Sequence, residues 1–181
     1  GGANTSLGTC SLKENTTGVH NVAVGKDALE ANTTGGCNTA VGKEALAANT
    51  TASDGVAVGY LSLNSNTTGI RNTAVGRCSM QANTSGCCNV AVGSRAMLVN
   101  VSGDFNTALG GSALESNTTA NNNTAVGAHS LKVNTTGTVN TAFGYGALCS
   151  NTTGVNSTAI GQFALRDQTT AGSGNVAVGD L

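Results

Sequence analysis

Two histidines and six cysteines are the residues of this 181-residue chain that most readily act as nucleophiles, general bases or metal ligands. His20 and His129 lie far apart, and the chain contains no Cys-x-x-Cys, His-x-x-x-His or Gly-Gly-x-Gly-x-Asp motif. Zinc sites and the calcium sites of β-rolls use such spacings, and catalysis needs several reactive groups in one pocket. We therefore expect no catalytic residue, no metal site, no cofactor and no enzymatic activity, with both histidines on the solvated surface.

The six cysteines follow no regular spacing, which argues against a repeated staple within the chain. Six exposed thiols are an oxidation liability in the cytosol, so their number favours an oxidising compartment with disulfides, including bonds between chains. Neutral surface substitution is the alternative. The candidates for disulfide formation are Cys10, Cys37, Cys78, Cys87, Cys88 and Cys149.

A stretch close to Asn-Thr-Thr-Gly returns at regular intervals and allows three interpretations. The first is structural, with asparagines hydrogen-bonded in ladders along a stack. The second is N-glycosylation, because the stretch begins an Asn-x-Ser/Thr sequon at Asn15, Asn32, Asn49, Asn66, Asn83, Asn100, Asn117, Asn134 and Asn151. The third is a row that contacts ice, another ligand or a neighbouring chain, formed by Thr16, Thr33, Thr50, Thr67, Thr84, Thr118, Thr135, Thr152 and Thr169.

The geometry of a strand limits the third interpretation. Neighbouring residues of a strand point to opposite faces, so only one of the two adjacent threonine rows is expected at the surface. A further row, which includes Thr39 and Thr73, becomes a candidate if it faces outward.

All these residues belong to one repeat, which defines a single domain over residues 1–181. The 17-residue unit is Asn-Thr-Ala-Val-Gly-x-x-Ala-Leu-x-x-Asn-Thr-Thr-Gly-x-x, and its residues are called positions 1 to 17 below. Ten full coils and a partial eleventh, which follows a one-residue insertion, start at residues 4, 21, 38, 55, 72, 89, 106, 123, 140, 157 and 175. Such a period predicts a stack in which each unit contacts its neighbours.

The composition of each position predicts its orientation. Position 5 is always glycine, which indicates a positive φ or a close backbone approach, and positions 3, 4, 8 and 9 are small or apolar and are expected to face inward. All 17 charged residues fall at positions 6, 7, 10, 11, 16 and 17, which predicts three solvent-facing corners. We expect an all-β fold, a parallel β-solenoid or β-roll with three sides. Helix formers in segments such as 43–48 leave open a short helical turn there, with one strand per coil.

The stretch Asn21-Val22-Ala23-Val24-Gly25, with Ala28 after two variable residues, resembles the head repeats of trimeric autotransporter adhesins. The full unit, with Ala-Leu-x-x-Asn-Thr-Thr-Gly following, is similar to repeat arrays of phage tail-fibre and surface proteins that carry a C-terminal autocleaving chaperone domain. The resemblance implies a trimeric or fibrous surface protein, and it assigns no binding residue.

Net charge and hydropathy argue against two classes of function, nucleic-acid binding and membrane spanning. A net charge of −1 gives no attraction for nucleic acid, and no apolar run approaches the ~20 residues that span a bilayer. The N-terminus lacks an initiator Met and a signal peptide, so we expect a mature product or a fragment of a longer chain.

The predicted function is a structural or adhesive module of an extracellular, cell-surface or virion-surface fibre. Its partners would be itself, as a homotrimer or end-to-end filament, and glycans or a host surface. The alternatives are an ice-binding solenoid, similar to insect antifreeze proteins, and a glycan-coated filament.

Overall fold

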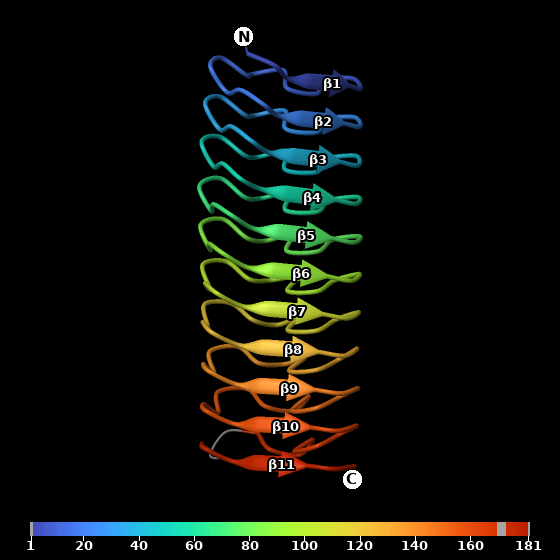
Figure 1. The fold of residues 1–181 in the computed structure, drawn as a ribbon, viewed down its shortest axis with the longest axis vertical. Coiled ribbons are helices and arrows are strands. Elements are labelled where there is room, and N and C mark those ends of the chain that lie inside the picture. The colour runs from blue at the N-terminus through green and yellow to red at the C-terminus, as the bar shows by residue number, and fades with distance from the viewer. Residues whose placement is uncertain (1, 170–172, 181) are drawn as a thin grey trace.

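The computed structural model describes residues 2–169 and 173–180 and shows a parallel β-solenoid (Figure 1). Each coil contributes one strand of three residues, and the strands stack into one parallel sheet in sequence order. The strands are β1 (Thr5–Leu7), β2 (Val22–Val24), β3 (Thr39–Val41), β4 (Val56–Val58), β5 (Thr73–Val75), β6 (Val90–Val92), β7 (Thr107–Leu109), β8 (Thr124–Val126), β9 (Thr141–Phe143), β10 (Thr158–Ile160) and β11 (Val176–Val178).

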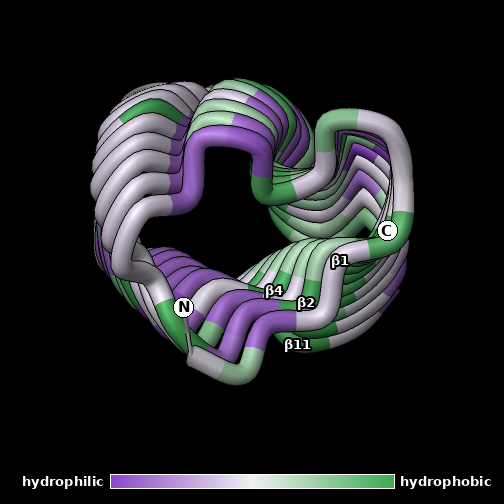
Figure 2. The backbone as a smooth tube through the Cα atoms, turned by 90° about the horizontal axis from the view of Figure 1, so that it is seen from above, coloured by the Kyte–Doolittle hydropathy of each residue, from purple (hydrophilic) through white to green (hydrophobic). Residues whose placement is uncertain are grey.

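The strand register confirms the 17-residue period. Ala23 of β2 pairs with Ala40 of β3, and the same offset holds up to β10. Ala159 of β10 pairs with Ala177 of β11, one residue later, where the insertion falls. Equivalent positions therefore lie above one another along the rod, and residues of like hydropathy form stripes (Figure 2).

The prediction that positions 3 and 4 both face inward is wrong for position 4. Ala23 and Ala40 are fully buried at position 3, whereas Val92 is 39% exposed and Phe143 is 56% exposed at position 4. Alternation within a three-residue strand places positions 2 and 4 on the face opposite position 3. The outward side chains at positions 2 and 4 of β1–β11 are called the sheet face below.

Positions 8 and 9 do face inward, as predicted. Ala28 and Leu29 are fully buried, and Met80 and Met97 occupy the same interior row as the leucines. Together with the alanines of position 3 they form one apolar cluster along the rod.

The segment after each strand contains turns rather than the helical turn that its composition left open. Glu44, at position 7, has a φ of 58°, and Leu46, at position 9, has a φ of 50°. A right-handed helix requires negative φ throughout, and no helix occurs in the described residues. Among these residues, accordingly, nothing forms a helix long and apolar enough to cross a membrane.

The glycine at position 5 meets both expectations from the sequence. Gly93 has a φ of 137°, and a Cβ there would lie 2.6 Å from the carbonyl carbon and oxygen of Gly110 in the next coil. Backbones of successive coils approach too closely at this corner for any side chain.

Candidate functional site

The two histidines do not form a common site. His20 is exposed, and His129 is partly buried with its ring edge-to-face against Tyr145 at 5.7 Å between centroids. Tyr145 makes a similar contact with Phe163 at 5.2 Å, so His129 belongs to an aromatic cluster along one corner.

One group with metal-ligating side chains was not found from the sequence. Stacking brings Cys10, Asp27 and Glu30 together, with their ligand atoms within 4.8 Å of one another. The signal was the 17-residue offset between Cys10 and Asp27, which no contiguous motif reveals. Both carboxylates already face a lysine ammonium, since Lys26 lies 3.0 Å from Asp27 and Lys13 lies 3.6 Å from Glu30.

All six cysteines are free thiols in the structure, so no disulfide forms within the described chain. Cys10 and Cys37 are exposed, Cys87, Cys88 and Cys149 are partly buried, and Cys78 is buried. The expected exposure therefore fails for Cys78. Disulfides between chains remain a prediction for the accessible thiols.

The threonines of position 13 use their hydroxyl hydrogens within the solenoid. The Thr16 hydroxyl donates to the Thr33 carbonyl at 2.9 Å, and Thr33 donates to the Thr50 carbonyl at the same distance. The same bond to the next coil is made by Thr50, Thr67, Thr84, Thr118, Thr135 and Thr152. Most of this row is partly buried, and Thr169 at its end is exposed.

The neighbouring position 14 lines the surface more fully than position 13. Its exposed residues are Thr17, Thr34, Thr51, Thr68, Ser85, Ser102, Thr119, Thr136 and Thr153. The expectation that adjacent rows point to opposite faces does not apply, because this segment is a bend and not a strand.

The sequon asparagines form the predicted ladder. The Asn100 amide nitrogen donates to the Asn83 side-chain oxygen at 2.8 Å and to the Gly103 carbonyl at 3.1 Å. The other rungs, between Asn15 and Asn151, repeat this pattern. Asn15 is partly buried, and the other eight are at most 2% exposed.

This burial bears on the glycosylation hypothesis. Each of these amide nitrogens is buried and already donates hydrogen bonds to the asparagine of the preceding coil and to a backbone carbonyl. Attaching a sugar there would require the stack to open, so the geometry argues against glycans at the eight buried asparagines. Asn122 and Asn156, at position 17, also begin sequons, and their side chains are exposed.

The sheet face is a regular surface that runs along the whole described sheet, from β1 to β11. It contains no charged residue, and it combines Thr or Val at position 2 with Val, Leu, Ile or Phe at position 4. The threonine row that the sequence made a candidate only if it faces outward does lie on the sheet face. Thr141 is exposed, and the other five threonines are partly buried: Thr39, Thr73, Thr107, Thr124 and Thr158.

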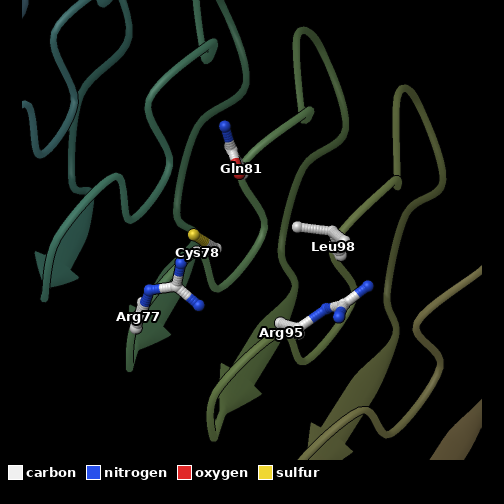
Figure 3. Close-up of a pocket in the computed structure, with 5 residues that line it drawn as sticks. All are labelled: Arg77, Cys78, Gln81, Arg95 and Leu98. Atoms are coloured by element: carbon white, nitrogen blue, oxygen red, sulfur yellow. The ribbon is translucent and has the colours of Figure 1, made fainter.

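A pocket lies on a different part of the coil, between the fifth and sixth repeats (Figure 3). Its volume is about 210 Å³, and it is lined by Arg77, Cys78, Gln81, Arg95 and Leu98. These residues occupy positions 6, 7 and 10 of adjacent coils, which belong to two neighbouring corners whose residues vary from repeat to repeat. The sequence gives no motif for this pocket because its lining comes from two coils.

Ion pairs at the exposed corners shift several pKa values. Hydrogen bonding to Glu14 raises the pKa of Lys13, with a smaller contribution from the charge of Glu30. Hydrogen bonding to Asp27 likewise raises the pKa of Lys26.

At the other end of the rod, Arg166 and Asp167 make two hydrogen bonds of 3.0 and 3.1 Å. They raise the pKa of Arg166 and lower the pKa of Asp167.

Comparison with protein-family models, with curated proteins and with solved structures found no match. The structure alone therefore classifies the chain, as a parallel β-solenoid of 17-residue coils.

Proposed function

We propose that this chain is a structural repeat module of an extracellular or virion-surface fibre, in which rods pack together through their sheet faces. The observation that carries the proposal is the uncharged, largely apolar sheet face, which continues along all eleven strands. Large exposed apolar patches on proteins are typical of interaction surfaces. The resemblance to adhesin and tail-fibre repeats supports the same role.

The size of the sheet face fits association with another copy. Eleven strands about 4.8 Å apart, each of three residues with a rise of about 3.3 Å, form a strip of about 500 Å². Two such strips would bury about 1,000 Å² in total, the lower limit of specific protein interfaces. Association would therefore strengthen with the number of repeats, as a fibre requires.

The variable corners supply the adhesive part of the proposal. The interior holds positions 6, 7, 10, 11, 16 and 17 at a regular axial spacing while their side chains differ from coil to coil. A weak contact that several coils repeat gains affinity through avidity.

Sedimentation velocity of the purified chain tests this function. We expect the wild-type chain to form oligomers, and Val92→Lys with Phe143→Lys, both on the sheet face, to weaken association at least tenfold. Thr119→Lys with Thr136→Lys adds the same charge on the exposed position 14 and should leave association unchanged. Circular dichroism checks that all variants fold. A wild-type chain that stays monomeric at every concentration overturns the proposal.

Ice binding is the second candidate, and the outward-facing threonines of the sheet face favour it. This function predicts a monomer with measurable thermal hysteresis. Thr124→Lys on the sheet face should abolish that activity, and Thr136→Lys at the exposed position 14 should preserve it. A wild-type monomer without thermal hysteresis excludes this candidate as well.

A further inference from the structure

We propose that the corner pocket between the fifth and sixth coils binds an oxyanion, a carboxylate or sulfate, carried by a small and partly apolar ligand such as an acidic sugar. The residues that line this pocket do not belong to the sheet face. Its binding would therefore persist even if the rod proved monomeric.

Arg77 supplies the positive charge of this pocket. Its side chain is exposed and makes no ion pair with any described residue. A guanidinium presents paired N–H donors that match the two oxygens of a carboxylate or sulfate.

Arg77 differs from the other cations at position 6 in having no carboxylate partner within the described part of the chain. At position 6 of the second coil, Lys26 pairs with Asp27 at 3.0 Å, and in the third coil Lys43 pairs with Glu44 at 3.1 Å. In the fifth coil the residue after Arg77 is Cys78, so the neutralising carboxylate is missing. The cation is thus left to interact with a ligand.

Arg95 shapes the other side of the pocket. Its guanidinium forms an ion pair with Glu115 of the next coil. In Figure 3 its guanidinium points away from Arg77. This leaves room beside Cys78, and it leaves Arg77 as the one cation lining the pocket without an ion pair among the described residues.

The other residues that line the pocket indicate the chemistry of the rest of the ligand. Gln81 offers an amide that can donate or accept hydrogen bonds, and Leu98 adds an apolar surface opposite (Figure 3). The volume of about 210 Å³ is below the ~300 Å³ at which ligand pockets usually begin. The pocket therefore fits one charged group and part of a ring rather than a whole large ligand.

Isothermal titration and amide chemical shifts test the site, with N-acetylneuraminic acid and sodium sulfate as separate probes. We expect saturable binding of at least one probe, with shifts at Arg77 and Gln81. Arg77→Gln should weaken binding at least tenfold. The methyl ester of the sugar, which lacks the carboxylate charge, should bind at least tenfold more weakly than the acid.

Two further variants separate this site from general charge attraction. Arg71→Gln removes another exposed arginine, which does not line the pocket, and should leave affinity unchanged. Glu115→Gln releases Arg95 and should tighten binding severalfold. Equal losses in the Arg71 and Arg77 variants, or no saturable binding of either probe, overturn the proposal. Sulfate binding alone assigns the site to free anions or sulfated groups, whereas tighter binding of the sugar acid assigns it to acidic saccharides.

Discussion

The interior of the solenoid has two regions that are equally buried and held together differently. The apolar region contains the alanines and leucines of positions 3, 8 and 9, such as Leu114, which is fully buried. The polar region contains the asparagines of positions 1 and 12, such as Asn21 and Asn32, which are also fully buried.

Hydrogen bonds explain how the polar region tolerates burial. The carbonyl oxygen of Gly35 accepts from both Asn21 and Asn32, at 2.9 and 3.0 Å. The Asn21 side-chain oxygen accepts the backbone N–H of Asn38 in the next coil at 3.0 Å. A buried amide with several partners avoids the penalty of an unsatisfied polar group.

The difference shows that the two regions specify different properties. An asparagine bonds only to a partner at a fixed height, so the ladders hold successive coils in register. The apolar region accepts exchanges of similar volume, as Met80 and Met97 show in a row of leucines. The polar region therefore fixes the repeat length, and the apolar region contributes burial energy.

The strongest test transfers a polar group into the apolar region. Leu114→Asn should lower the free energy of unfolding by roughly 5 kcal/mol, because it removes a buried leucine and buries an amide without ladder partners. Leu114→Met, which copies Met97, should reduce stability by less than about 1.5 kcal/mol. Guanidinium unfolding measures both. Similar losses of stability in the two variants would mean that the apolar region accepts a polar side chain as readily as an apolar one, and the contrast with the polar region would not hold.

A smaller loss is expected when the ladder itself is interrupted. Asn100→Ala leaves the Asn83 side-chain oxygen without the donor that it has at 2.8 Å, which should decrease stability by roughly 3 kcal/mol. Asn15 is partly buried at the first rung, so Asn15→Ala should lower the free energy of unfolding by about 1 kcal/mol, the net value of an ordinary hydrogen bond. Guanidinium unfolding compares the two variants, and an equal loss at both sites would mean that burial does not determine how much each rung stabilises the chain.

Much of this interior was predictable from the sequence, and the exceptions have physical reasons. The period, the inward Ala23 and Leu29, the glycine corner and the asparagine ladder follow from composition at each position. The outward face of position 4 was missed because valine is apolar. Thr39 and Val41 of β3 share a face in any strand, so the frequent threonine at position 2 was the signal that this face is exposed.

Other features could not be derived from residue types. Leu46 adopts a left-handed backbone with a φ of 50°, a conformation that raises the energy of most non-glycine residues by roughly 1–2 kcal/mol. Only contacts with adjacent coils can hold it there. The pocket beside Arg77 was equally hidden, because its shape depends on the direction that Arg95 takes toward Glu115.

The corner at position 17 differs from both interior regions, because residues there have a strained backbone although most of them are exposed. Val139 is 51% exposed with a φ of 59°, which is unfavourable for a β-branched residue. Asn122 and Asn156 occupy the same position with similar φ. Val139→Asn should therefore raise the free energy of unfolding by about 1 kcal/mol, as a higher melting temperature would show. Val126→Asn, within β8, should have the opposite sign because a strand favours valine.

The smallest effect is expected from the charges of the corners. The hydrogen bonds from Arg166 hold the pKa of Asp167 below its ordinary value of 3.8. A lowered carboxyl pKa in the folded state contributes stability above the unfolded pKa, and that contribution disappears as the pH falls through the folded pKa. The unfolding midpoint should therefore stay constant from about pH 7 to about pH 5 and fall slightly below pH 4. In Arg166→Gln, an NMR titration should show the Asp167 pKa near its ordinary value, with little change in the midpoint at neutral pH. A large loss of stability in that variant would mean that corner charges support the coil, and the separation between a stabilising interior and freely variable corners would no longer hold.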